Sequence, residues 1–141
     1  MKRKSESKLV SDCRIWFHNN YCLKNSIPKL AWILLPNEVA MKVRGLLLQC
    51  NVSSKIISQV VGFISQDMQS LGLHPGASDV IIAMPNGVTL WCEFKLPTNN
   101  QQPNQIEFEE TVTKLGHTYV VIKSLDQFKD VIIQELSKNE A

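Results

Sequence analysis

The chain has 141 residues, of which 44% are hydrophobic and 20% charged, and its formal net charge is +2. This size suits a single domain over residues 1–141 with a buried core, and the composition excludes a largely disordered chain. No apolar run approaches the roughly 18 residues of a membrane span, and no apolar signal segment follows the basic start at Met1–Lys4. We therefore expect a cytoplasmic protein with no membrane partner.

The cysteines are spread along the chain without a C-x-x-C pair, which argues against a structural zinc site and against disulfides in a reducing compartment. We expect all four to be buried as small apolar residues: Cys13, Cys22, Cys50 and Cys92. The small net charge permits a nucleic-acid partner without requiring one. Four basic residues near the start could contact phosphate or form a solvated tail: Lys2, Arg3, Lys4 and Lys8.

Apolar spacing predicts a helix over residues 5–20, a short strand over 31–35 and a second helix that begins at Ser53–Ser54 and stops at Gly72. The six apolar positions of that second helix follow helical spacing: Ile57, Val60, Val61, Ile64, Met68 and Leu71. The stretch 38–50 is ambiguous between helix and loop. These elements form a mainly helical extension, about 5–71.

After Gly72 the pattern changes to that of strands. Two apolar runs, 79–84 and 88–94, flank the turn signal Pro85-Asn86-Gly87 and predict a hairpin. Pro103 suits the first position of a helix that runs to residue 115, a strand follows over 118–122, and Ser124–Gln127 forms a capping box for a last helix to about residue 138. The order predicts an α/β fold with a small mixed sheet flanked by helices.

The triplet Glu93-Phe94-Lys95 lies within an apolar strand, where a charge is costly unless it has a partner or a function. A second Glu-x-Lys triplet, which begins at Glu6, lies at a helix start and shows that the motif alone is weak. On a strand Glu93 and Lys95 point to the same face. A three-residue Pro85-Asn86-Gly87 loop, or a bulge, would bring Asp79 to that face, whereas a two-residue turn would not.

Two carboxylates and a backbone carbonyl suit a hard ion such as Mg²⁺ or Mn²⁺, with Lys95 orienting water or balancing charge on a phosphate. The alternative is a structural ion pair in the hairpin. Gln105 is placed in the first turn of the next helix, on its apolar face, and could reach the site or serve as an ordinary helix-terminal amide. Glu6 is a further candidate that could lean inward from the first helix.

Taken in order, these residues resemble the VRR-NUC domain of the PD-(D/E)XK nuclease superfamily, in particular the short phage and bacterial stand-alone members. The matching pattern covers about 72–132 and consists of Gly76-x-x-Asp79, Glu93-Phe94-Lys95-x-Pro97, Pro103-x-Gln105 and Gly116-His117-x-Tyr119-Val120-Val121. A fainter match includes Pro28-Lys29-Leu30 and Leu35-Pro36-Asn37-Glu38. The usual proline before the aspartate is Ser78 here.

The resemblance implies a restriction-endonuclease-like core and Mg²⁺- or Mn²⁺-dependent DNA cleavage, with no small-molecule cofactor. It implies Asp79, Glu93 and the Phe94 carbonyl as metal ligands, Lys95 as a catalytic residue and Gln105 as an accessory one. The helix-one glutamate of the family aligns with Glu6, with Asp12 as the alternative. The resemblance further implies a homodimer that acts on branched DNA such as four-way junctions, in a phage or bacterial host cytoplasm. Two alternatives remain: an inactive DNA-binding module of the same fold, and an interaction protein whose ion pair is structural.

Overall fold

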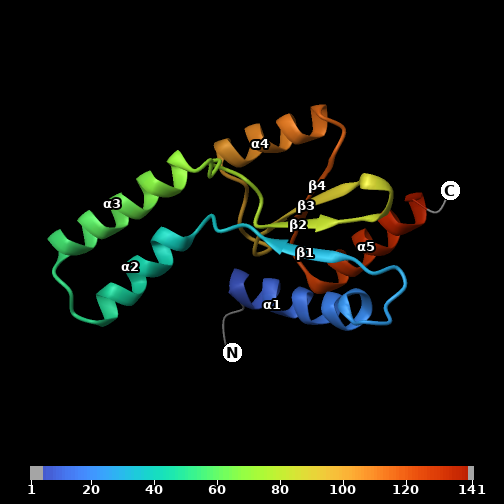
Figure 1. Cartoon of the computed structure of the whole chain (residues 1–141), viewed down its shortest axis with the longest axis horizontal. Helices are drawn as coiled ribbons and strands as arrows, with labels where there is room; N and C mark the ends of the chain where they lie inside the picture. Colours follow the sequence, from blue (N-terminus) through green and yellow to red (C-terminus); the bar gives the residue numbers. More distant parts are fainter. Residues whose placement is uncertain (1–4, 140–141) are drawn as a thin grey trace.

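The computed structural model describes residues 5–139, and the basic residues at positions 2–4 lie outside this range. Within it, the elements follow the order predicted from the sequence, and Figure 1 shows their arrangement. They are α1 (Glu6–Phe17), a wider helical turn (His18–Cys22), β1 (Ala31–Leu34), α2 (Val39–Gln49), α3 (Ser54–Ser70), β2 (Val80–Ala83), β3 (Thr89–Phe94), α4 (Pro103–Lys114), β4 (Thr118–Ile122) and α5 (Leu125–Asn139).

The four described strands form one mixed sheet in the order β1-β2-β3-β4. The first three strands pair antiparallel and β4 pairs parallel to β3, with α4 as the connection between them. In Figure 1, α4 covers one face of the sheet while α1 and α5 cover the other. The predicted α/β class with a small mixed sheet flanked by helices is confirmed.

Three helix starts have serine caps, of which those at Ser53 and Ser124 were predicted from the sequence. Ser5, Ser53 and Ser124 each accept a hydrogen bond from a backbone N–H in the first turn of the helix that follows, at 3.2, 3.5 and 3.1 Å. Pro103 occupies the first position of α4, where its missing N–H costs nothing. Gly72, just past the end of α3, has φ +99°, a conformation that favours glycine.

The core lies on both faces of the sheet. On the α1/α5 face, rings from two helices and two strands pack together: the fully buried Phe17 and Phe128 contact Trp32, and Phe128 also contacts Phe94. On the α4 face a smaller cluster contains Phe108, Val112 and Tyr119. Because alternate residues of β3 point to opposite faces, Phe94 enters the first core while Glu93 faces α4.

Helices α2 and α3 pack mainly on one another and project away from the sheet, as Figure 1 shows; we call this pair the helical arm. The ambiguous stretch 38–50 is therefore mostly helix, at Val39–Gln49. Of the apolar positions predicted for α3, only Ile57 is fully buried, and Leu71 is 78% exposed. The predicted face packs mainly on α2, so it buries less than a helix packed on the sheet would.

One expectation was wrong. Cys13 and Cys92 are buried as predicted and Cys22 is half-buried, but Cys50 is exposed because it lies at the outer turn of the helical arm. Across residues 5–139 we find no helix with both the length and the apolar character that a membrane crossing requires.

Candidate active site

The hairpin has the register that the sequence predicted. Val80 pairs with Cys92 and Ala83 with Thr89, which leaves a three-residue loop of Pro85, Asn86 and Gly87. The loop reverses the chain through two left-handed residues, Asn86 at φ 61° and Gly87 at φ 74°. One residue before the first pair, the Asp79 N–H donates to the Cys92 carbonyl at 3.1 Å, so Asp79 lies beside the end of β3.

Asp79 is held against β3 by its side chain. Its Oδ2 accepts a hydrogen bond from the Phe94 N–H at 2.8 Å, and no described residue donates to Oδ1. Burial raises the pKa of Asp79 to about 6; the Phe94 N–H opposes this shift, the charge of Glu38 adds to it and that of Lys95 opposes it. Asp79 thus has one bound carboxylate oxygen and one available oxygen.

Glu93 is 2% exposed, and its two oxygens have different surroundings. Oε1 accepts a hydrogen bond from the Gln105 amide at 2.5 Å and lies 3.3 Å from the Lys95 ammonium. Oε2 is buried and has no partner among the described residues. Burial, followed by the charge of Asp79, raises the pKa of Glu93 to about 7, and Lys95 opposes the shift. A buried acceptor without a donor is costly unless a ligand satisfies it.

Gln105 uses both ends of its amide. Its Oε1 accepts from the Gln102 N–H at 2.8 Å, which completes the capping box of α4, while its Nε2 donates to Glu93. The cap therefore fixes which end of the amide faces the carboxylate. Gln105 is therefore a helix-terminal amide that also contacts Glu93, and its function as a site residue stays a prediction.

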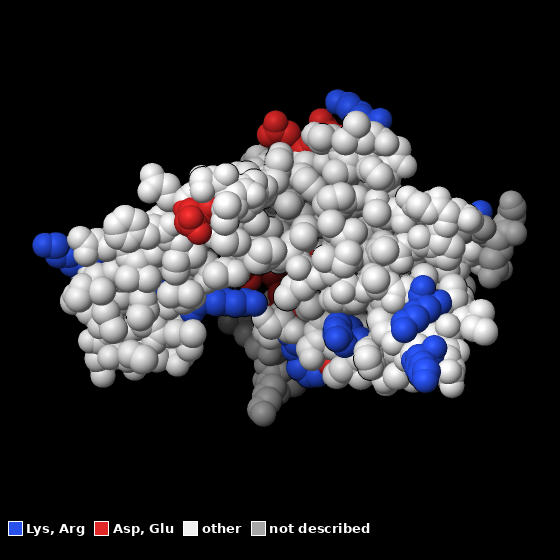
Figure 2. All heavy atoms as spheres, viewed as in Figure 1, with Lys and Arg blue, Asp and Glu red and all other residues white. Residues whose placement is uncertain are grey.

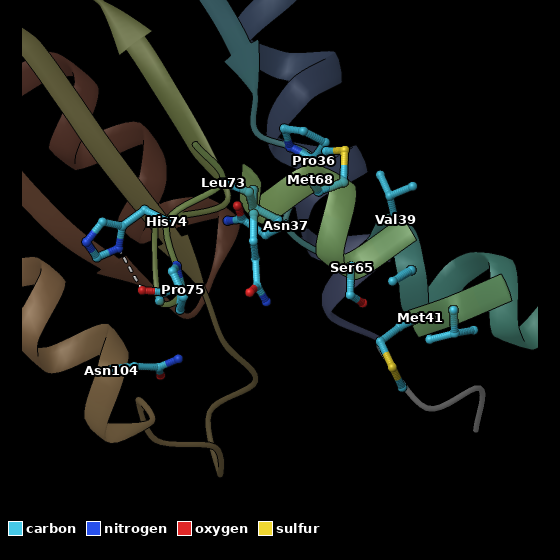
Figure 3. Close-up of a pocket in the computed structure, with 14 residues that line it drawn as sticks. Pro36, Asn37, Val39, Met41, Ser65, Met68, Leu73, His74, Pro75 and Asn104 are labelled. Atoms are coloured by element: carbon cyan, nitrogen blue, oxygen red, sulfur yellow. Dashed lines mark hydrogen bonds between the residues drawn. The ribbon is translucent and has the colours of Figure 1, made fainter. Parts of the chain in front are cut away.

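Gly76 lets the segment before Asp79 approach the start of α4. A Cβ at this position would clash with the backbone carbonyl of Asn104 and lie 2.9 Å from the Gln105 nitrogen, and the φ of +81° also favours glycine. Figure 3 shows Asn104 across from the His74–Pro75 loop, at a pocket of about 300 Å³ between α4 and the helical arm. The close approach places Gln105 within reach of Glu93.

Asn37, which follows β1, holds the backbone at residues 77–79 in place. Its Nδ2 donates to the carbonyls of Ala77 and Ser78, each at 2.7 Å, and the Leu35 N–H donates to the Asp79 carbonyl at 2.8 Å. In Figure 3, Asn37 lies between Pro36 and the Leu73–Pro75 loop. The backbone on which Asp79 stands is therefore fixed from both sides.

Of the two candidates in α1, Glu6 is the one near the cluster. Its charge raises the pKa of both Asp79 and Glu93, and its Oε1 accepts a hydrogen bond from Asn99 at 3.0 Å. Asp12 instead forms an ion pair with Lys8 at 2.7 Å on the surface. The structure thus brings together Asp79, Glu93, Lys95 and Gln105, with Glu6 at the edge of the group.

The donor chemistry of the cluster fits a hard divalent cation. Within the described part of the chain, no group of three His, Cys, Asp or Glu side chains is placed to hold a metal ion. Asp79 and Glu93 each keep one oxygen without a donor in the range 5–139, and oxygen ligands are those that Mg²⁺ and Mn²⁺ prefer. Further ligands would have to come from a backbone carbonyl, water or phosphate.

Sequence reasoning missed the function of three residues that position the cluster: Asn37, Gly76 and Asn99. Asn37 and Gly76 belong to patterns noted above, but nothing local distinguishes them from ordinary turn residues. Glycine is compatible with a close backbone approach, but it is equally common in ordinary turns, so the sequence alone does not assign this function to Gly76. Asn99 acts across 93 residues of sequence, which no local pattern predicts.

Comparison with known proteins gives the following findings. No family model matches the chain. Over 78 residues the chain is 30% identical to "Putative nuclease p44" of Acyrthosiphon pisum secondary endosymbiont phage 1, in an alignment that covers 54% of this chain and 83% of the phage protein. A solved structure described as "VRR_NUC domain protein" superimposes with a TM-score of 0.64 at 19% identity, over 95% of this chain and 89% of that chain. The structural likeness shows a shared fold.

Proposed function

Because this chain belongs to the VRR-NUC family of nucleases, we propose that it is a metal-dependent endonuclease that hydrolyses the phosphodiester bonds of DNA. Its active site in this proposal is formed by Asp79, Glu93 and Lys95. The observation that carries this proposal is the buried Glu93 Oε2, which has no partner among the described residues, next to the carboxylate of Asp79. A purely structural ion pair between Glu93 and Lys95 would not require this second carboxylate.

In this proposal Asp79 and Glu93, with the Phe94 carbonyl, would hold a Mg²⁺ or Mn²⁺ ion, and Glu6 would add a further negative charge near them. When bound, the ion supplies a lowered pKa for coordinated water and stabilisation of negative charge on the phosphate. The raised pKa values of Asp79 and Glu93 are those of the protein alone, and a cation favours the ionised carboxylates.

Lys95 places a positive charge at the phosphate. Its side chain is 12% exposed and its ammonium lies 3.3 Å from Glu93 Oε1. As water attacks phosphorus and one phosphorus–oxygen ester bond breaks, negative charge develops on the phosphoryl oxygens, and Lys95 stabilises it. Gln105 orients the Glu93 carboxylate through Oε1, so that the other oxygen, Oε2, stays directed away from the amide.

The substrate and assembly follow from the family resemblance rather than from a contact within the chain. We propose branched DNA, such as a four-way junction, as the substrate. We further propose a homodimer, because two copies related by a twofold axis would place two such sites against the two strands to be cut. The location proposed is the phage or bacterial host cytoplasm.

A cleavage panel tests the proposal. Junction, flap and linear duplex DNA are incubated with the protein in Mg²⁺, in Mn²⁺ and in EDTA, alongside the Asp79→Asn and Lys95→Met variants. We expect metal-dependent cutting by the wild type, fastest on branched DNA, and loss of cutting in both variants. If the wild type binds DNA but cuts no more than the variants, the chain is an inactive DNA-binding module and the proposal is wrong.

A further inference from the structure

A groove of about 620 Å³ leads to Asp79 between α1 and the junction of β1 with α2. Its volume falls in the range of ligand-binding sites. Figure 2 shows acidic atoms at the bottom of a hollow between the helical arm and the rest of the molecule, with basic side chains at its rim. Both Asp79 and Glu6 line this groove, so it is continuous with the cluster described above.

Two basic side chains line the groove from opposite walls. Arg14 comes from α1 and Lys42 from α2, and both residues are exposed. Neither forms an ion pair with any residue in the range 5–139, although Glu6 and Glu38 line the same groove. Two cations without acidic partners, beside a cluster that acts on phosphodiesters, are suited to bind phosphates.

The groove also has an apolar part. It is formed by the end of β1, where Leu34 is 59% exposed and Trp32 is half-buried, and Val10 of α1 contributes from the side. β1 is the edge strand of the sheet, so the residues at its end are open to a ligand. Proteins that bind single-stranded nucleic acid combine a basic groove that follows the phosphates with side chains, above all aromatic ones, on which the bases lie. In this groove Trp32 is the aromatic side chain, and the more exposed Leu34 extends the apolar part. In duplex DNA the base faces are stacked within the helix and only the base edges are accessible in its grooves, so no base can lie flat on the apolar part.

We propose that this groove binds a single-stranded DNA segment, with phosphates at Arg14 and Lys42 and bases over Leu34, and so leads the strand to be cut toward Asp79. The inference rests on the proposed function for the identity of the ligand. It adds that the substrate must have an unpaired strand beside the cleavage position, as a flap or an opened junction arm has. The carboxylates of Glu6 and Glu38 repel phosphate, so affinity depends on the two cations.

Binding is measured without cleavage, in EDTA, with a fluorescein-labelled oligothymidylate and with a duplex of the same length. The groove variant is Arg14→Ala/Lys42→Ala. The matched control, Lys55→Ala/Lys114→Ala, removes the same charge from exposed residues outside the groove. We expect the groove variant to bind the single strand at least tenfold more weakly and to lower the slope of log affinity against log salt by about 1.4, or about 0.7 for each lost phosphate contact.

A second variant, Leu34→Ser, tests the apolar part of the groove separately from its charges. It should weaken single-strand binding severalfold with the salt slope unchanged, while duplex binding stays the same. The inference is overturned if the groove variant binds the single strand as tightly as the control variant does. It is also overturned if the groove variant and Leu34→Ser weaken duplex binding as much as they weaken single-strand binding. Cleavage is scored separately: groove-dependent binding without any cutting in Mg²⁺ would reject the proposed nuclease and retain the groove.

Discussion

Replacement of Gly76 by alanine should damage the site from a distance. The new methyl group would clash with the Asn104 carbonyl and lie 2.9 Å from the Gln105 nitrogen, a separation that real Cβ atoms essentially never show. The backbone at the start of α4 must then move by several tenths of an ångström. Since the Gln105 amide both caps α4 and donates to Glu93, the movement disturbs both hydrogen bonds.

The cost has two parts. An alanine in the left-handed conformation is strained by about 1–2 kcal/mol, and overpacking against a fixed backbone adds about 1–3 kcal/mol. We expect Gly76→Ala to lower the free energy of unfolding by about 2–5 kcal/mol. If the nuclease proposal holds, a misplaced Gln105 should also reduce the cleavage rate roughly tenfold, because small displacements of positioning groups are costly.

Gly116→Ala is the matched control. Gly116 has a similar φ of +88°, but nothing lies within 4 Å of a Cβ built there, so this variant carries the strain without the clash. Urea unfolding should separate the two variants by the overpacking part, and single-turnover cleavage should be slowed only by Gly76→Ala. In the double variant with Gln105→Ala, Gly76→Ala should add no further loss of rate. Equal effects of the two glycine variants, or additive effects in the double variant, would refute the reasoning.

Three further predictions concern the residues around the cluster. The variant Asp79→Asn keeps an acceptor for the Phe94 N–H, so its unfolding curve should match that of the wild type. Because the variant loses a proposed metal ligand, its cleavage rate should fall on the order of 10³-fold. A large loss of stability would contradict the assigned hydrogen bond. The raised pKa values of about 6 and about 7 for Asp79 and Glu93 mean that metal-free protein holds extra protons near pH 6, which an ion must displace. The Mg²⁺ affinity measured by calorimetry should therefore rise about tenfold between pH 6 and pH 8, and an affinity independent of pH would refute the raised pKa values. Because the folded protein binds these protons more tightly than the unfolded chain, its free energy of unfolding in EDTA should fall as pH rises from about 4 through 7. Asn37→Leu leaves two carbonyls without their donor and should cost about 1–3 kcal/mol in urea unfolding, whereas Asn20→Leu, which removes a single exposed bond, should cost less than about 1 kcal/mol.

The hairpin was the part of the fold that the sequence predicted most closely. The spacing of Pro85, Asn86 and Gly87 selected a three-residue loop, and the loop length fixed the register that brings Asp79 beside Glu93. Local chemistry determines this geometry, so a local pattern was sufficient. The start of α4 was predictable for the same reason, because Pro103 fits only the first turn of a helix.

Other features could not be predicted because their causes lie elsewhere in the chain. The helix α2 has no side-chain cap, and it exposes Met41, Leu46 and Leu48, so no clear apolar stripe marks it. Asn37 bonds carbonyls 40 and 41 residues away, and the close approach of Gly76 to Asn104 exists only after α4 has packed on the sheet. Such tertiary contacts leave no periodic signal in the sequence.

The helical arm has a mechanical consequence. Both of its ends join the body next to Asp79: the Leu35 N–H and the Asn37 side chain hold one end to the backbone at residues 77–79, and the other end runs through Gly76 into the same segment. Because both ends of the arm join the body at this segment, we expect a tilt of the arm to displace the Asp79 carboxylate relative to Glu93.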